Sequence, residues 1–233
     1  MPPRPTARER VRAELTREIT DVARARLAAD GAAALSLRAV ARELGMVSSA
    51  IYRYFASRDE LLTALIIEGY DALGAAVEQA DAACAREDYP ARWRAAAGAA
   101  RDWALAHPHE YALLYGSPVP GYQAPADTIA PAARSAAVFG RLVSQAQAAG
   151  VLRPLPAGPP VPPTLTGDLG QLRADLMPGV PDEVVAAALT VWAGVFGVIS
   201  FELFGQFNNV IADRDAYFGR ALADLARLFG LPA

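Results

Sequence analysis

The stretch from Ser36 to Glu60, SLRAVARELGMVSSAIYRYFASRDE, decides the fold of this 233-residue chain. It predicts two short helices, at 37–44 and 49–55, joined by a turn at Gly45. Glycine tolerates positive φ, and a small residue at Ala41 allows the helices to cross closely. The apolar seam between them consists of Val40, Leu44, Met46 and Ile51. We therefore predict a helix-turn-helix.

Serine residues stand where these helices are expected to begin. Ser36 and Ser48 are candidate N-caps, because a serine hydroxyl accepts a hydrogen bond from the first turn of a helix. Ser57 and Glu60 form a capping box, in which the Ser57 hydroxyl serves the backbone of Glu60 and the Glu60 carboxylate reaches back to Ser57. A long helix is predicted to follow, to about Cys84.

The second short helix presents small, tyrosine and arginine side chains, which suits contact with duplex DNA. An arginine can donate two hydrogen bonds to guanine, whereas tyrosine and serine hydroxyls mainly position the phosphate backbone. The charge agrees with this placement: residues 1–60 hold 11 Arg against 8 Asp and Glu, although the whole chain has a net charge of −3.

The pattern A-x-x-L-G-x-x-x-x-x-[IL]-Y-x-[YH]-F-x-[SN]-[KR]-[DE]-x-L resembles the DNA-binding signature of the TetR family of bacterial regulators. The resemblance covers about residues 10–62. It implies contacts to base edges from Ser48, Ser49, Ala50, Arg53 and Arg38. It implies contacts to phosphates from Tyr52, Tyr54, Arg58 and Ser36.

Two details of this interface are left open by the sequence. The family more often has Lys at the position of Arg58, so the geometry of that phosphate contact can differ. Arg4 and Arg8 belong to an N-terminal arm that either reaches a minor groove or is a solvated tail. Arg38 and Arg53 are the residues expected to discriminate sequence.

The remainder of the chain is predicted to be helical, so the fold class is all-α. Helical spacing of apolar residues and breaks at Gly and Pro predict helices at about 6–30, 90–106, 126–149, 182–207 and 213–229, with short ones before Gly116 and within 164–177. Six prolines make residues 154–163 a linker. We predict a three-helix DNA-binding domain at 1–56 and a larger ligand-binding and dimerisation domain at 57–233.

The last two helices are predicted to form a dimer interface. Segments 192–205 and 107–116 are similar to one subgroup of TetR C-terminal domains, in which the last two helices of each protomer make a four-helix interface. A helix pair this apolar is unfavourable in water, so it must be covered either by a surrounding core or by the surface of a partner. The candidate interface residues are Ala193, Gly197, Phe201, Phe204, Phe218, Leu222, Leu225 and Phe229.

An effector pocket is expected among the helices near 90–149 and 182–207. Aromatic side chains supply apolar walls with a few hydrogen-bonding groups. The candidates are Trp93, Trp103, Tyr111, Tyr115, Tyr122, Phe139, Trp192 and Phe196, most of which are equally suited to a core.

Other functions are disfavoured by the same sequence. His107 and His109 lack ligands at metal-site spacing, Cys84 lacks a basic partner, and no catalytic motif or cofactor fingerprint is found, so neither an enzyme nor a metal or cofactor is expected. Val184–Phe201 holds 18 residues without a charge and could span a membrane, but its flanks carry no basic cluster.

Together these features predict a cytoplasmic bacterial transcription regulator. The expected mechanism is a homodimeric repressor that binds a palindromic operator and is released by a small, mainly apolar effector. The alternative is a regulator or sensor tethered to a membrane by residues 184–201.

Overall fold

A computed structural model describes residues 6–156 and 160–232 of the chain. Within these residues every regular element is a helix, which confirms the all-α prediction. Arg4 of the predicted N-terminal arm lies outside the described residues. The chain forms two compact units, Met1–Gly69 with His107–Ile129, and Tyr70–Ala106 with Ala130–Ala233. The division at 56/57 was predicted on functional grounds and stays a prediction.

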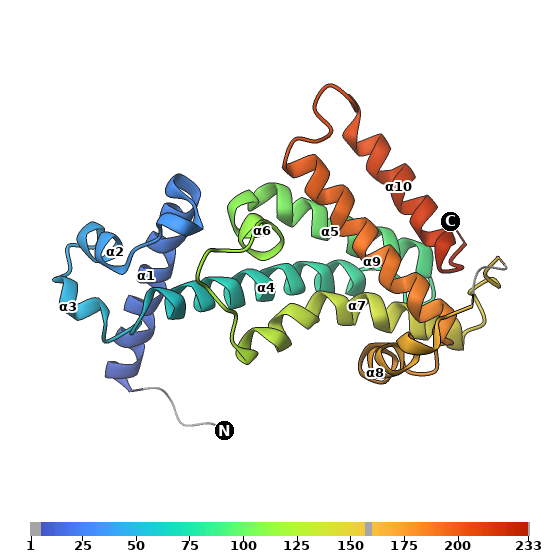
Figure 1. Cartoon of the computed structure of the whole chain (residues 1–233), viewed down its shortest axis with the longest axis horizontal. Coiled ribbons are helices and arrows are strands. Elements are labelled where there is room, and N and C mark those ends of the chain that lie inside the picture. Colours follow the sequence, from blue (N-terminus) through green and yellow to red (C-terminus); the bar gives the residue numbers. More distant parts are fainter. Residues whose placement is uncertain (1–5, 157–159, 233) are drawn as a thin grey trace. The chain divides into compact units, whose positions relative to one another are not determined.

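The first unit contains the predicted helix-turn-helix (Figure 1). Its elements are α1 (Ala7–Asp30), η1 (Ala32–Ala34), α2 (Leu37–Glu43), α3 (Ser48–Ile51), the first half of α4 (Arg58–Ala82), α6 (Pro108–Tyr115) and η2 (Ala126–Thr128). The second unit contains the rest of α4, α5 (Tyr89–Ala106), α7 (Ile129–Ala148), η3 (Pro163–Leu165), α8 (Thr166–Leu176), α9 (Asp182–Leu203) and α10 (Arg214–Leu228).

Helix α1 begins with a capping box that was not predicted from the sequence. The Thr6 backbone N–H donates to Glu9 Oε2 at 2.6 Å, and the Glu9 N–H donates to Thr6 Oγ1 at 3.3 Å. Hydrogen bonding of the Glu9 carboxylate to the backbone and side chain of Thr6 lowers the pKa of Glu9, because it favours the charged form. The helix ends at Gly31, whose φ of 78° is a value that L side chains rarely adopt.

The turn after α2 closes as a Schellman motif, which explains the glycine at position 45. The Met46 N–H donates to the carbonyl of Ala41 at 2.8 Å, and the Gly45 N–H donates to that of Arg42 at 3.2 Å. Gly45 has φ 66°. This left-handed conformation satisfies the last carbonyls of α2 and redirects the chain into α3.

Helix α3 is shorter than the predicted 49–55. It covers Ser48–Ile51, and Val47 is its N-cap, so Ser48 is the first helical residue instead of the cap. The chain continues to Phe55 as tight turns, in which the N–H of Arg53 donates to Ala50 O and that of Tyr54 to Ile51 O. Bonds of this i to i+3 kind replace the last helical turn.

Two other predicted caps also differ in detail. Ser36 occupies the N-cap position of α2 but its side chain makes no capping hydrogen bond. At the start of α4, the Glu60 N–H donates to Ser57 Oγ at 3.1 Å as predicted, whereas the Glu60 carboxylate accepts from the N–H of Ala56 instead of Ser57.

The core of the first unit joins α1, α2, α3 and α4. Ile19, Val40, Ala41, Ile51 and Leu61 are each fully buried. Burial of these apolar side chains is the main force that fixes the angle between the two short helices. The side chains of Leu113 and Tyr122 pack against the same cluster from the segment after α5.

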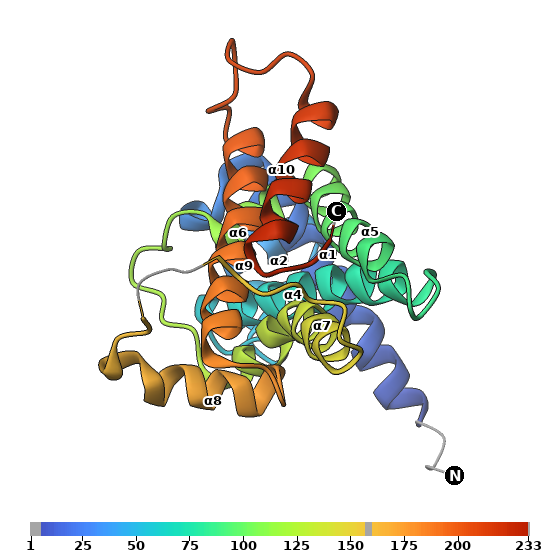
Figure 2. The same ribbon diagram turned by 90° about the vertical axis from the view of Figure 1, so that its right-hand side faces the viewer.

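The second unit is built around α9, which contacts α5, α8 and α10. Figure 2 shows α9 and α10 side by side. Trp93 of α5 lies at the centre of this packing: its indole N–H donates to the carbonyl of Leu222 at 3.1 Å, and its ring makes edge contacts with Phe139 and Phe229. A fork from Arg101 to Glu202, with two 2.7 Å hydrogen bonds, ties α5 to α9 and raises the pKa of Arg101.

Candidate nucleic-acid interface

The surface of α2 and α3 carries most of the predicted DNA-binding residues. Ser48, Ser49 and Arg53 are exposed, and Tyr52 is 45% exposed. Arg38 is exposed on α2. Because α3 is only one turn long, the exposed tyrosine and arginine are presented by the turns that follow it, which the bonds to Ala50 and Ile51 hold in place. Ala50 itself is half-buried.

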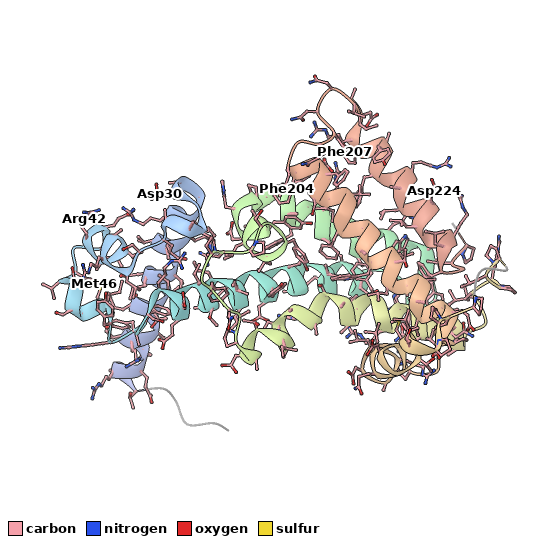
Figure 3. All side chains as sticks on the ribbon, viewed as in Figure 1. Asp30, Arg42, Met46, Phe204, Phe207 and Asp224 are labelled. Carbon is pink, nitrogen blue, oxygen red and sulfur yellow. The ribbon has the colours of Figure 1, made fainter. Side chains whose placement is uncertain are left out.

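Some exposed arginines on α2 and after α3 have no acidic partner among the described residues, whereas others in the first unit are paired. Arg38, Arg42 and Arg53 make no ion pair with any residue that the structure describes. Figure 3 shows Arg42 on the outer side of α2 and Met46 in the turn after it. A guanidinium with no carboxylate partner keeps its donors available for phosphate or base oxygens. Arg42 was not predicted from the sequence, although its position four residues after Arg38 places both on one helix face.

By contrast, Arg24 and Arg26 are engaged inside the unit. Arg24 pairs with Glu68 at 2.8 Å, and Arg26 pairs with Glu43 at 2.8 Å. Burial raises the pKa of Glu68 despite its arginine partner. These two arginines tie α1 to α4 and α2, so they are not candidates for DNA contact.

Arg58 is also engaged inside the unit, and its predicted contact with a phosphate stays a prediction. Its Nε donates to Leu35 O at 3.1 Å, and its Nη2 donates to Ala32 O at 2.9 Å and to Ala33 O at 3.3 Å. The guanidinium thereby caps the carbonyls of η1 and links the start of α4 to the segment before α2. A phosphate contact would have to compete with these hydrogen bonds.

Tyr54 and Arg12 form a contact at the end of residues 48–55, which we call the recognition segment. Tyr54 is half-buried and packs against the core of the unit. The Arg12 guanidinium lies 5.7 Å from the centre of the Tyr54 ring and donates to Arg53 O at 3.1 Å. Arg12 braces the interface from α1, and no motif in the sequence pointed to it.

Family models match both parts of the chain. Residues 19–65 match the model described as bacterial regulatory proteins, tetR family, and residues 93–225 match that of a tetracyclin repressor-like C-terminal domain. The HTH-type transcriptional regulator Rv1816 of Mycobacterium tuberculosis is 43% identical over 214 residues, which cover 91% of this chain and 90% of that protein. The chain belongs to the TetR family. It is a transcription regulator with a DNA-binding helix-turn-helix, not an enzyme.

Solved structures of similar proteins have the same fold. The putative regulatory protein SCO4313 is 36% identical with a TM-score of 0.76, covering 94% of this chain and 98% of that one. A protein of unknown function from Rhodococcus sp. RHA1 is 30% identical with a TM-score of 0.71, covering 94% of this chain and 96% of that one. The similarity to known TetR structures therefore extends over both units, well beyond the segment 10–62 that carries the sequence signature.

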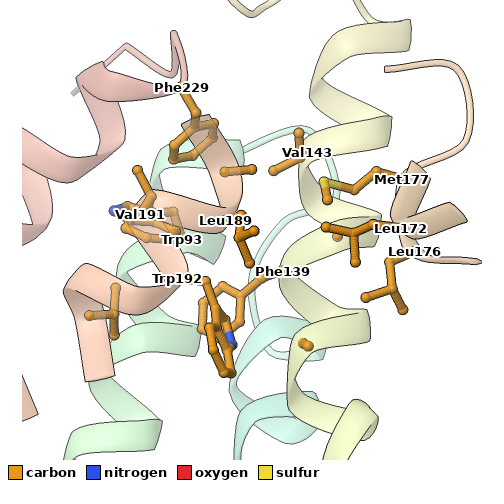
Figure 4. Close-up of a pocket in the computed structure, with 14 residues that line it drawn as sticks. Trp93, Phe139, Val143, Leu172, Leu176, Met177, Leu189, Val191, Trp192 and Phe229 are labelled. Atoms are coloured by element: carbon orange, nitrogen blue, oxygen red, sulfur yellow. The ribbon is translucent and has the colours of Figure 1, made fainter. Parts of the chain in front are cut away.

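The second unit contains an apolar cavity of about 210 Å³ (Figure 4). Three of the predicted pocket residues, Trp93, Phe139 and Trp192, line it. The rest of its wall comes from Ala136, Gly140, Val143, Leu172, Leu176, Met177, Ala188, Leu189, Val191, Val195 and Phe229. Helix α8 and the residue after it thus supply a wall that was not predicted from the sequence.

The other predicted pocket residues do not line this cavity. Tyr111, Tyr115 and Tyr122 belong to the first unit, where Tyr111 is fully buried and the Tyr122 hydroxyl lies 2.9 Å from Thr63 Oγ1. Trp103 and Phe196 are buried in the second unit away from the cavity lining. These five aromatic residues are used in packing, which composition alone could not distinguish from a ligand wall.

The predicted dimer residues divide by helix. On α9, Ala193 and Phe201 are exposed; Phe204, at the end of α9, is exposed beside the connection that carries Phe207 (Figure 3). Gly197 is half-buried. On and after α10, the expected contacts Phe218, Leu222 and Phe229 are buried within the protomer, and Leu225 packs close to Gly194. Phe218, Leu222 and Phe229 belong to the core of the second unit and Leu225 is half-buried, and their role in a dimer interface stays a prediction.

Helix α9 is long and apolar enough to cross a membrane by length and composition. A third of its most apolar window is buried within the protomer. The helix lies inside the segment that matches the TetR C-terminal family model, and its Glu202 is buried in the fork with Arg101.

Proposed function

We propose that the protein is a homodimeric repressor whose two α2–α3 surfaces bind successive major grooves of a palindromic operator. The observation that carries the DNA-contact assignment is the group of exposed arginines, Arg38, Arg42 and Arg53, that have no acidic partner in the described part of the chain and lie on either side of Tyr52. Half-sites in such complexes lie roughly 34 Å apart, one turn of the duplex.

The residues are proposed to act in two ways. Arg38 and Arg53, with Ser48, Ser49 and Ala50, face base edges, while Tyr52, Ser36 and Arg42 bind phosphates. Ser36 suits a phosphate contact because its hydroxyl is not used as a cap. Tyr54 and Arg58 act indirectly, by holding the recognition segment and the η1 segment in position.

Gel shift with the DNA upstream of the protein's own gene tests this assignment. Tyr52→Phe removes one hydroxyl and Arg53→Ala one guanidinium, and neither side chain is buried. We expect Arg53→Ala to abolish the sequence-specific shift and Tyr52→Phe to weaken it. Arg94→Ala is the matched control, because Arg94 is an exposed arginine of the second unit. An unchanged shift with Arg53→Ala would overturn the assignment.

The dimer contact is proposed to run along the outer face of α9. Ala193 and Phe201 lie four and twelve residues after Leu189, and Leu189 and Phe201 are 46% and 53% exposed. An apolar stripe of this kind is unfavourable in water and suits an isologous contact with a second copy. Phe201→Asp should give a monomer in sedimentation velocity, with unchanged helix content. A dimer that persists would exclude α9 as the interface.

The effector is proposed to bind the cavity of the second unit and to act on DNA binding through α4. Helix α7 lines the cavity with Phe139 and Val143. The same helix carries Arg134, which forks to Glu78 on α4 at 2.9 and 2.7 Å and also donates to Asp71. Because α4 runs without a break from Arg58 to Ala82, a ligand that shifts α7 changes the end of α4 next to the helix-turn-helix. The ligand must favour the form that does not bind DNA.

We propose a cytoplasmic location and an interface role for α9 in preference to the membrane-tethered alternative. A span over residues 184–201 would end directly before Glu202 and would remove α9 from its packing against α5, which the Arg101–Glu202 ion pair supports. Fractionation of cells without detergent tests this: the chain should be recovered in the supernatant at low salt. Recovery in the membrane pellet would support the tethered regulator.

A further inference from the structure

The cavity of the second unit has a wall of almost uniform chemistry. Its lining contains no charged residue, and aliphatic and aromatic side chains surround it on α5, α7, α8 and α9 (Figure 4). Taking a charged group out of water into such a wall is strongly unfavourable when no partner compensates it. The wall therefore excludes carboxylate and ammonium groups from its interior.

One polar group interrupts this wall. The indole Nε1 of Trp192 is covered from solvent and makes no hydrogen bond within the described part of the chain. Figure 4 shows the nitrogen on the edge of the ring that faces the α7 side of the cavity. Buried donors are nearly always satisfied in native proteins, so one without a partner beside a cavity calls for an acceptor.

The other tryptophan of the wall gives the contrast. The indole N–H of Trp93 is satisfied by the carbonyl of Leu222 at 3.1 Å. Trp93 therefore offers a ligand only its apolar ring, whereas Trp192 offers a ring and a hydrogen-bond donor. Trp192 is half-buried, and its ring lies 5.1 Å from that of Phe196 with the two planes tilted by 45°.

The volume sets the size of the occupant. An apolar cavity of about 150 Å³ holds one benzene molecule. By the same proportion, about 210 Å³ holds a molecule of about eight non-hydrogen atoms. This is the size of one ring with a short substituent.

We propose that the cavity binds an uncharged, single-ring or comparably small apolar molecule with one hydrogen-bond acceptor, and that Trp192 Nε1–H donates to that acceptor. This inference rests on the proposed effector role of the cavity for its regulatory meaning only. The ligand chemistry follows from the wall and from the unpaired donor, and can be tested without DNA.

Three probes of nearly equal size and shape separate the requirements. Acetophenone carries a ketone oxygen, α-methylstyrene replaces that oxygen by a CH₂ group, and benzoate replaces the methyl ketone by a carboxylate. Binding to the full-length protein is measured by titration of ¹⁵N-labelled chain, in which each of the three tryptophans gives an indole N–H signal. We expect acetophenone to bind and to move the Trp192 signal downfield, and benzoate to bind far more weakly.

Trp192→Phe isolates the hydrogen bond. The preference for acetophenone over α-methylstyrene should fall about fivefold in this variant, the effect of one buried neutral hydrogen bond. Comparing the two ligands in the two proteins cancels the change in cavity shape, because both ligands experience it. Trp103→Phe is the control, since Trp103 does not line the cavity, and should leave the preference unchanged.

Any of three results would overturn the proposal. These are an equal preference for acetophenone over α-methylstyrene in the wild type and in Trp192→Phe, tight binding of benzoate, and no binding of acetophenone up to its solubility limit. DNA release is measured separately by fluorescence anisotropy. Binding with the expected preference but without release of DNA would support the ligand class and contradict the effector role.

Discussion

Replacing Arg58 by Gln removes a guanidinium that donates to the carbonyl oxygens of Leu35, Ala32 and Ala33. If these hydrogen bonds are its main role, the variant loses stability and keeps its DNA contacts. If Arg58 instead binds a phosphate, the variant keeps its stability and loses a contact. Arg42→Gln is the matched comparison, because Arg42 is exposed and makes no ion pair among the described residues.

The two outcomes differ in magnitude as well as in kind. A hydrogen bond from a charged donor contributes about 1.5–3 kcal/mol when buried. The Arg58 side chain is 29% exposed, so we take about 1 kcal/mol for each of its two shorter bonds, a loss of about 2 kcal/mol. For a cooperative chain of this length, that loss lowers the melting temperature by about 4–8 °C. Each lost phosphate contact lowers the slope of log K against log salt by about 0.9, or about 1.8 for a dimer.

Both quantities can be measured without knowing the operator. Fluorescence anisotropy with a random-sequence duplex gives the salt slope, because phosphate contacts also operate in non-specific binding. Thermal unfolding followed by circular dichroism gives the stability. We expect Arg58→Gln to have a lower melting temperature and the salt slope of the wild type. We expect Arg42→Gln to have the melting temperature of the wild type and a reduced salt slope. A stable Arg58→Gln protein with a reduced slope would refute the structural role of Arg58.

Three further substitutions test other parts of the fold. Gly45→Ala should cost about 1 kcal/mol in urea unfolding, because its φ of 66° is unfavourable for alanine although no atom lies within 4 Å of the added Cβ. Gly140→Ala should lower the free energy of unfolding by about 1–3 kcal/mol, because the added Cβ would lie 2.5 Å from a backbone carbonyl oxygen of α8. Gly98→Ala, in a helix with open space around the added Cβ, should instead raise it by about 0.5–1 kcal/mol. Equal effects of the two substitutions would contradict the close α7–α8 contact. The hydrogen bonds from Arg134 lower the pKa of Glu78, so the stability that this pair contributes is present above the ordinary carboxyl pKa and is lost as pH falls through the lowered pKa. Arg134→Ala should therefore raise the pKa of Glu78 in an NMR titration. An unchanged pKa would show that the Arg134–Glu78 hydrogen bonds do not form in solution.

The helix-turn-helix could be predicted from the sequence because its determinants are local. Gly45, Ala41 and the apolar seam all lie within residues 40–51, and the turn after α2 forms by hydrogen bonds between residues five or fewer positions apart. The length of α3 was missed because its last turn tightens to i to i+3 bonds, which no residue type in that segment signals. The exposed arginines were predicted in part, with Arg42 omitted.

The second unit was predicted less completely because its site depends on contacts between distant segments. Tyr111 and Trp93 look alike as candidates in the sequence, yet one is packed in the first unit and the other lines the cavity. The wall from α8 was missed because Leu172 and Leu176 carry no motif and follow a proline-rich linker. Phe218 and Leu222 have the spacing of an apolar stripe, but spacing cannot distinguish a core from a partner surface.

Net charge gives a poor measure of how the first unit meets DNA, because the charges are not distributed evenly over it. The excess of three arginines over acids in residues 1–60 is small. However, Asp21, Asp30 and Glu43 neutralise Arg24 and Arg26 in local ion pairs. The remaining arginines on α2 and after α3 have no acidic partner among the described residues, so in the proposed complex they would act on phosphates at short range, where salt screens their charge least. An acidic chain can bind a polyanion when its acids are paired away from the binding surface, and the pairing pattern predicts that surface better than the sum of charges does.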